Sequence, residues 1–149
     1  MRKFILASVS AAALMAAVPA MAAVGGNTSD VSQTGVSQTA TVTQTAAGGS
    51  DSKITQTAGS NTATVTQAGR DGDSVITQSG TGAKATVTQT GVDPLTFFLP
   101  GSGDSNTSVV TQTTAGDATV IQAGELNDSL VNQTANALAT VEQSGIYNH

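Results

Sequence analysis

Residues 50–67 read SDSKITQTAGSNTATVTQ, and this stretch decides the fold. It contains two short segments that are separated by the corner residues Ala, Gly, Ser and Asn. Every second residue follows a pattern, Ser-x-Ile-x-Gln in the first segment and Ala-x-Val-x-Gln in the second. A period of two is typical of β-strands, because successive side chains point to opposite faces. We therefore predict a strand, a corner and a second strand.

The same template, S-x-[IV]-x-Q followed by A-x-V-x-Q, occurs five times, in residues 27–44, 50–67, 72–89, 106–122 and 127–143. Only Ile and Val exchange between the repeats. We predict that the patterned residues, together with Asn61 of the quoted corner, form a self-assembly core. In the first segments they are Ser29, Val31, Gln33, Ser52, Ile54, Gln56, Ser74, Ile76, Gln78, Ser108, Val110, Gln112, Ser129, Val131 and Gln133. In the second segments they are Ala40, Val42, Gln44, Ala63, Val65, Gln67, Ala85, Val87, Gln89, Ala118, Val120, Gln122, Ala139, Val141 and Gln143.

The spacing of these repeats predicts the architecture. Repeat starts at 27, 50, 72, 106 and 127 lie about 22 residues apart, except at one longer gap. A period of this size is typical of a solenoid, whose units cannot bury a face alone. Glycine is frequent at the corners, where turns require it. The predicted fold class is all-β, a two-sheet parallel β-solenoid of strand–turn–strand coils with cross-β geometry.

The composition excludes an ordinary globular core. Of 149 residues, 38% are hydrophobic, 3% aromatic and 10% charged, whereas globular domains carry about 25% charged residues. The most frequent residues are Thr, Gln, Ser, Ala, Gly and Val. A chain with this low-complexity composition either stays disordered or stacks as a repeat. Low charge and abundant Thr and Val argue against disorder.

The first 22 residues are predicted to be a secretory signal peptide. Arg2 and Lys3 precede an apolar run at 4–18, and Ala20-Met21-Ala22 supplies an A-x-A cleavage site. The run is too short to serve as a membrane anchor. Residues 23–26 then form a short N-terminal segment, and 27–149 form the repeat domain. Cleavage leaves three basic residues against ten acidic ones, a net charge of −7 that disfavours nucleic acid.

Ten glutamines share the strand parity of Ile, Val and Ala. A buried amide without partners costs about 1–3 kcal/mol. Stacked in register, each glutamine amide donates to one neighbour and accepts from the other, as in cross-β packing. The first and last coils would keep one unmatched side each, with little charge or proline to block it. Two matching open edges on one molecule favour a head-to-tail homopolymer.

The spacing S-x5-Q-x4-N-x5-Q, present at Ser50, Gln56, Asn61 and Gln67, resembles the curlin repeat of bacterial curli subunits. The resemblance extends over nearly the whole of residues 27–143. It implies a secreted functional amyloid that assembles into extracellular, cell-surface fibres for biofilm matrix and adhesion. It also implies a nucleator subunit, a dedicated outer-membrane secretion pore and a periplasmic chaperone as partners.

Residues 92–105 (VDPLTFFLPGSGDS) interrupt the repeats with two prolines and two phenylalanines. The simplest interpretation is a tolerated surface loop at a solenoid corner. The alternative is an apolar tab for lateral fibre contact or for docking an assembly factor.

The sequence offers no set of catalytic residues. His149 is its sole histidine and cysteine is absent, so a nucleophile lacks a base. Asp71-Gly72-Asp73 lacks the rest of a calcium loop. We predict no enzymatic activity, no metal site and no cofactor.

Two alternative functions remain open. Outward threonines at T-x-T spacing (Thr41/Thr43, Thr64/Thr66, Thr86/Thr88) are typical of ice-binding β-solenoids, although Ile121, Glu142 and Lys84 interrupt the array. A minor, nucleating fibre subunit is the other alternative.

Overall fold

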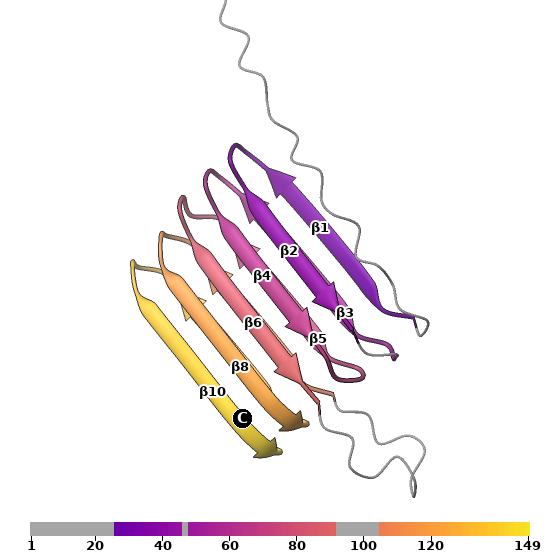
Figure 1. Cartoon of the computed structure of the whole chain (residues 1–149). Helices are drawn as coiled ribbons and strands as arrows, with labels where there is room; N and C mark the ends of the chain where they lie inside the picture. The colour runs from indigo at the N-terminus through magenta and orange to yellow at the C-terminus, as the bar shows by residue number, and fades with distance from the viewer. Residues whose placement is uncertain (1–25, 46–47, 92–104) are drawn as a thin grey trace, which may run out of the picture.

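The structure is a computed structural model that describes residues 26–45, 48–91 and 105–149. The predicted signal peptide and nearly all of the interruption at 92–105 lie outside the described residues. The described chain contains ten strands in two five-stranded sheets, each with parallel pairing. Figure 1 shows equivalent strands following one another along a single stacking axis.

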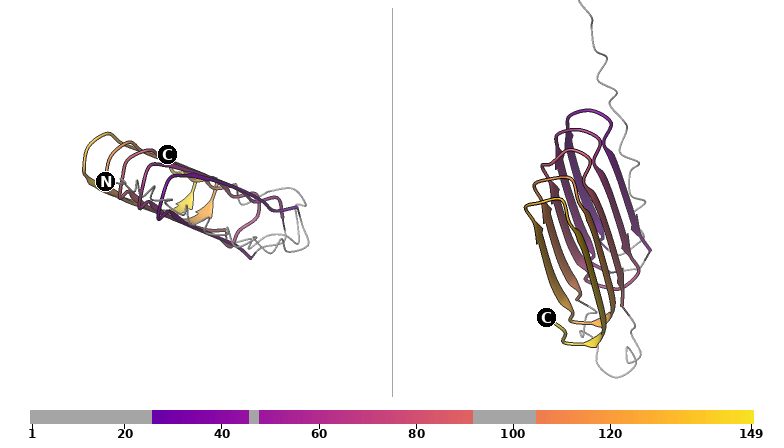
Figure 2. Two further views of the ribbon diagram at one scale, coloured as in Figure 1. Left: turned by 90° about the horizontal axis from the view of Figure 1, so that it is seen from above. Right: turned by 90° about the vertical axis from the view of Figure 1, so that its left-hand side faces the viewer.

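Each coil contributes one strand to each sheet, so the two strands of a coil face each other and do not pair. The first sheet contains β1 (Thr28–Thr34), β3 (Asp51–Thr57), β5 (Asp73–Gln78), β7 (Thr107–Gln112) and β9 (Asp128–Gln133). The second contains β2 (Thr39–Gln44), β4 (Thr62–Gln67), β6 (Lys84–Thr90), β8 (Asp117–Glu125) and β10 (Leu138–Ile146). The two sheets form a flat slab (Figure 2).

The register of the stack is that of the sequence template. Gln33 pairs with Gln56 between β1 and β3, and Gln44 pairs with Gln67 between β2 and β4. The longer gap between the third and fourth coils leaves the register unchanged, because Asp73 pairs with Thr107. The predicted two-sheet parallel β-solenoid is therefore confirmed.

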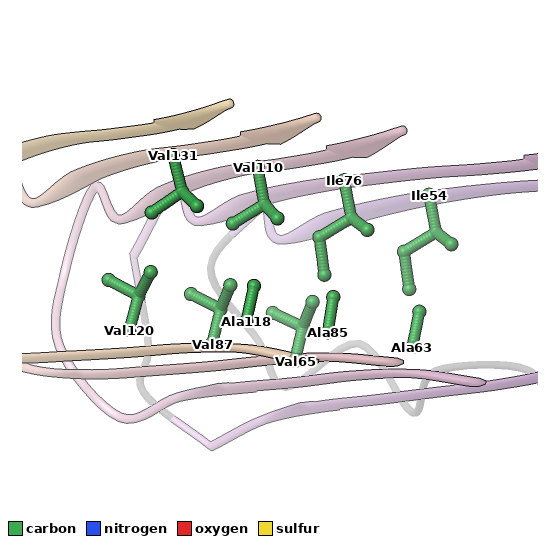
Figure 3. Packing of buried hydrophobic residues seen from close by; sticks show 10 residues of the cluster. All are labelled: Ile54, Ala63, Val65, Ile76, Ala85, Val87, Val110, Ala118, Val120 and Val131. Atoms are coloured by element: carbon green, nitrogen blue, oxygen red, sulfur yellow. The ribbon is translucent and has the colours of Figure 1, made fainter. Parts of the chain in front are cut away.

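The apolar core is one layer thick. Ile54, Ile76, Val110 and Val131 of the first sheet point toward valines and alanines of the second (Figure 3). Interior members such as Ile76 and Val87 are fully buried. In the end coils Val131 is buried, whereas five equivalent residues are only partly covered: Val31, Ala40, Val42, Ala139 and Val141. Full burial of most core positions therefore depends on a neighbouring coil on each side.

The corners bring successive backbones very close together. Gly124 has a φ of 116°, and a Cβ there would lie 2.0 Å from the Gly145 carbonyl oxygen. Only glycine fits such a contact at such a φ. Leu126 directly follows the same corner with a φ of 55°, in the left-handed region. The corners thus set how closely the coils stack.

Candidate functional site: the glutamine ladders and the end coils

Two glutamine ladders run the length of the stack, one in each sheet. In the first-sheet ladder, Gln33, Gln56, Gln78, Gln112 and Gln133 are joined through Nε2–Oε1 distances of 2.7 to 2.8 Å. In the second-sheet ladder, Gln44, Gln67, Gln89, Gln122 and Gln143 are joined at 2.8 to 3.0 Å. The predicted stacking of glutamine amides is therefore present in all five coils, although Gln33 and Gln143 at the ends are only partly buried.

The ladder amides also tie the two sheets together. Gln78 Nε2 donates to the Thr62 carbonyl oxygen at 3.1 Å, which lies at the start of a second-sheet strand. Gln89 Nε2 donates in the reverse direction, to the Asp73 oxygen at 2.9 Å. Both hydrogens of these amides thus have acceptors, which offsets the cost of burial. Sequence reasoning missed this second partner, because it is a main-chain atom of the facing strand.

These main-chain contacts give the ladders a direction. A carbonyl oxygen only accepts hydrogen bonds, so the amide atom beside it is the nitrogen. With that orientation, every ladder bond runs from Nε2 of one coil to Oε1 of the next coil along the chain. Each ladder therefore has an acceptor end and a donor end.

The two ends of the described stack are chemically complementary. On the first-coil face, Gln33 and Gln44 present Oε1 atoms that receive no ladder bond among the described residues. On the fifth-coil face, Nε2 of Gln133 and of Gln143 donate to main-chain oxygens and have no ladder acceptor in the described chain. One face accepts and the other donates.

A third line of polar contacts follows the corners that begin each coil. Ser50 N donates to Asn27 Oδ1 at 3.1 Å, and Asn127 N donates to Asn106 Oδ1 at 3.1 Å. At the other corner, between the two strands of its coil, Asn61 Oδ1 accepts from Ala83 N at 3.0 Å. Asn61 therefore joins its corner to that of the next coil.

The predicted core residues differ in how the structure buries them. Interior members are buried in both sheets, with Ser, Ile or Val, and Gln facing Ala, Val and Gln. Among the end-coil members, Ser29 is exposed, whereas Gln33 and Gln143 are partly buried. Two large apolar residues of the fifth coil face outward, Leu130 at 75% and Leu138 at 77% exposure.

The inward serines carry an unexpected feature. The hydroxyls of Ser52, Ser74, Ser108 and Ser129 are buried and have no hydrogen-bond partner among the described residues. Ser50 differs, because its Oγ donates to the Gly69 oxygen at 3.0 Å and accepts from Gly72 N at 3.3 Å. The inward serine column therefore fills space without bonding.

Ser74→Ala is accordingly expected to leave the free energy of unfolding unchanged or to raise it by up to about 1 kcal/mol, because a buried unpaired hydroxyl is removed. Ser50→Ala is the matched control and is expected to cost about 1 kcal/mol. Urea unfolding of the monomer measures both. A loss for Ser74→Ala as large as that for Ser50→Ala would contradict the assignment.

Acidic side chains gather at one outer edge of the first sheet. Asp51 and Asp73 are paired in register on β3 and β5. Desolvation by burial, followed by repulsion from Asp51 and Asp71, raises the pKa of Asp73 above its ordinary value. The folded state therefore binds this proton more tightly than the unfolded state does.

The tighter binding of this proton stabilises the folded state. The stabilisation is complete below the ordinary carboxyl pKa and is lost as the pH rises through the raised pKa of Asp73. Asp73→Asn is thus expected to raise the urea midpoint at pH 7 and to leave it nearly unchanged at pH 3. The effect is small, because the side chain is exposed. An equal shift at both pH values would show that charge is not the cause.

The described residues hold no group of three or more His, Cys, Asp or Glu side chains that could bind a metal ion. In the same part of the chain, no helix has the length and hydropathy to cross a membrane.

Comparison with protein families bears on the second and third coils. Residues 50–80 and 59–91 match the family model of the curlin associated repeat. Residues 50–91 are curlin associated repeats. The first, fourth and fifth coils share the strand register and the ladders of this matched region. No curated protein and no solved structure shows significant similarity to the chain.

Proposed function

We propose that this protein is the subunit of an extracellular, curli-like amyloid fibre and that it polymerises head to tail. The observation that carries the proposal is the complementarity of the two end faces. The fifth-coil face donates through Gln133 and Gln143, and the first-coil face accepts through Gln33 and Gln44. Two unlike faces on one molecule generate an open filament.

In this junction the fifth coil of one copy lies beneath the first coil of the next. Gln133 Nε2 donates to Gln33 Oε1 of the next copy, and Gln143 Nε2 donates to its Gln44 Oε1. The half-covered Val31, Val42 and Val141 become buried at the same time. Each junction therefore completes hydrogen bonds and apolar burial that an isolated molecule lacks.

Growth is expected to begin slowly and then to be templated. An isolated coil buries little, so the first stack forms slowly, whereas a fibre end offers an ordered edge to each chain that adds. The curlin repeats support secretion and a role in biofilm matrix and surface adhesion. A nucleator, a secretion pore and a periplasmic chaperone are the partners this role requires. The chain is not an enzyme in this proposal.

X-ray diffraction from aligned aggregates of the protein without residues 1–22 tests the proposal. Fibres of stacked coils are expected to give a reflection near 4.7 Å along the fibre axis and one near 10 Å across it. A protein that stays monomeric at high concentration would exclude the proposed function.

Ice binding is a second candidate, because the structure extends the outward threonine rows. Thr41, Thr64, Thr86, Thr119 and Thr140 form one unbroken row across the second sheet. The adjacent row ends in Ile121 and Glu142, which limits the flat array to one row. Thermal hysteresis of the monomer tests this candidate, and its absence would exclude it.

The nucleating role differs from the bulk role in one measurable respect. A nucleator added in trace amounts shortens the lag of another subunit, whereas a bulk subunit dominates the fibre mass. Quantifying this chain in fibres from its native host distinguishes the two.

A further inference from the structure

Residues 144–148 repeat the corner that joins the fourth and fifth coils. The order Gln122-Ala-Gly-Glu-Leu-Asn127 returns as Gln143-Ser-Gly-Ile-Tyr-Asn148. The backbone conformations return as well: φ is 116° at Gly124 and 109° at Gly145, and 55° at Leu126 and 61° at Tyr147. Asn148 therefore lies at the position where a sixth coil would begin.

The hydrogen bonds of Asn148 match those of a coil start. Asn148 N donates to Asn127 Oδ1 at 3.3 Å, as Asn127 N does to Asn106 Oδ1 at 3.1 Å. The carbonyl oxygen of Asn148 accepts from Asp128 N at 2.7 Å, just as that of Asn127 accepts from Thr107 N at 2.8 Å. Asn148 thus occupies one corner of the fifth-coil face.

This position is the one that an incoming copy requires. When a second copy stacks in the same register, its Thr28 lies level with Asp128, as Asp51 lies level with Thr28 within one chain. Its Asn27 then falls on the coil-start position, with its carbonyl oxygen toward Asp128 N. Asn27 and Asn148 offer the same main-chain and amide groups, and one site cannot hold both.

Asn148 lacks one hydrogen bond of the interior coil starts, although its Nδ2 donates to Asn127 Oδ1 at 2.8 Å and to the Ser144 oxygen at 3.1 Å. Gln67 and Gln122 each donate to the carbonyl oxygen of the residue that begins the next coil, Gly72 and Asn127. Gln143 donates to the Asp128 oxygen, as Gln67 and Gln122 also do to the equivalent oxygens of Asp51 and Thr107, but no bond from it to Asn148 is present in the described chain. The incoming Asn27, by contrast, is joined to a whole strand that pairs along β9.

We infer that Asn148 is a placeholder on the fifth-coil face, which Asn27 of the next copy displaces when a subunit docks. The inference rests on the proposed head-to-tail fibre. The exchange replaces one asparagine with another, so the ladders and the strand pairing drive it. Asn148 satisfies Asp128 N in the free molecule and delays docking at the growing end.

The first test compares seeded growth of the protein with and without residues 148–149, using seeds and monomers of the same form. Without the placeholder, elongation is expected to be about fivefold faster, the size of one net hydrogen bond that need not be broken. Removal of His149 alone is the matched control and is expected to leave the rate unchanged. An unchanged or slower rate without Asn148 would overturn the inference.

The second test needs no substitution, because Tyr147 and His149 are the only tyrosine and histidine in the chain. Selective isotope labelling of these residues therefore reports on the tail alone. In solid-state NMR spectra of wild-type fibres, the His149 signals are expected in the mobile fraction. Rigid His149 signals would overturn the placeholder and leave the fibre intact, whereas the absence of any fibre would remove the proposed function itself.

Discussion

Gln33→Lys is expected to slow fibre elongation by about a hundredfold. The substitution keeps an N–H donor toward Gln56 Oε1, which lies 2.7 Å from Gln33 Nε2. It removes the acceptor that the first-coil face offers and places a charge in the junction. An unpaired charge at a closing interface costs about 3 kcal/mol or more, which corresponds to a hundredfold. Elongation on preformed seeds, followed by dye binding, measures the rate.

A second substitution identifies the partner of Gln33 across the junction. Gln133→Glu keeps the oxygen that accepts from Gln112 Nε2 at 2.7 Å and converts the outward donor into an acceptor. Alone it is expected to slow growth, because it would face Gln33 Oε1. When both substitutions are combined, the introduced lysine of one copy meets the introduced glutamate of its neighbour. The rate is then expected to recover to within about tenfold of wild type, because the charge in the junction is paired.

The matched control combines Gln33→Lys with Gln143→Glu, which belongs to the other ladder and faces Gln44 of the next copy. This combination is expected to stay as slow as Gln33→Lys alone. Gln143→Lys by itself is expected to slow growth through the second ladder. Substitution of Thr55 or Thr111, whose side chains face outward, is expected to have little effect. Equal recovery with either glutamate substitution would refute the proposed register.

The sequence predicted the fold because each coil repeats one short pattern. Period-two alternation assigned the inward residues, and the Ile/Val and Gln positions set a register that the structure reproduces in all four junctions of each sheet. A shift of one residue would turn Gln and Ile to solvent, so the pattern tolerates only one register.

Features outside the template were harder to predict. The second acceptors of Gln78 and Gln89 are main-chain oxygens of facing strands. The distance between the two sheets decides which oxygens these amides reach, and that distance cannot be read from the sequence. The pattern placed the serines on the inward face, but it did not indicate that the hydroxyls of Ser52, Ser74, Ser108 and Ser129 have no hydrogen-bond partner among the described residues. The sequence did contain a pattern that marks Asn148 as equivalent to a coil start, because Asn106, Asn127 and Asn148 are evenly spaced, 21 residues apart.

Gln89→Leu is expected to cost the folded monomer about 3 kcal/mol, more than any single methylene of the apolar core. Gln89 accepts from Gln67 at 2.9 Å and donates to Gln122 Oε1 at 2.9 Å. Its amide nitrogen also donates to Asp73 and Asn106 oxygens at 2.9 Å. Leucine fills a similar volume but removes these hydrogen bonds and leaves the buried Gln122 Oε1 without its donor, whereas Gln67 Nε2 keeps its bonds to the Asp51 and Gly72 oxygens. The cost is about 1–3 kcal/mol for a buried group that keeps no other bond.

Ile76→Val is the matched control from the same coil. It removes one methylene from a fully buried side chain and imitates Val110 at the equivalent position of the next coil. Its expected cost is about 1 kcal/mol. Urea unfolding of freshly prepared monomer, with the slope of each transition compared, measures both variants.

The ranking of these two variants decides what holds the stack together. In a globular core, replacing both partners of a buried polar pair with apolar groups of similar shape is often neutral, because no polar group stays unpaired. Here the partners of Gln89 lie above, below and across from it, so a single leucine relieves none of them. If Gln89→Leu were as mild as Ile76→Val, apolar burial would dominate, and the end-face amides would lose their importance for growth. The expected order, with glutamine costlier, makes the same amide chemistry responsible for folding within a chain and for joining chains.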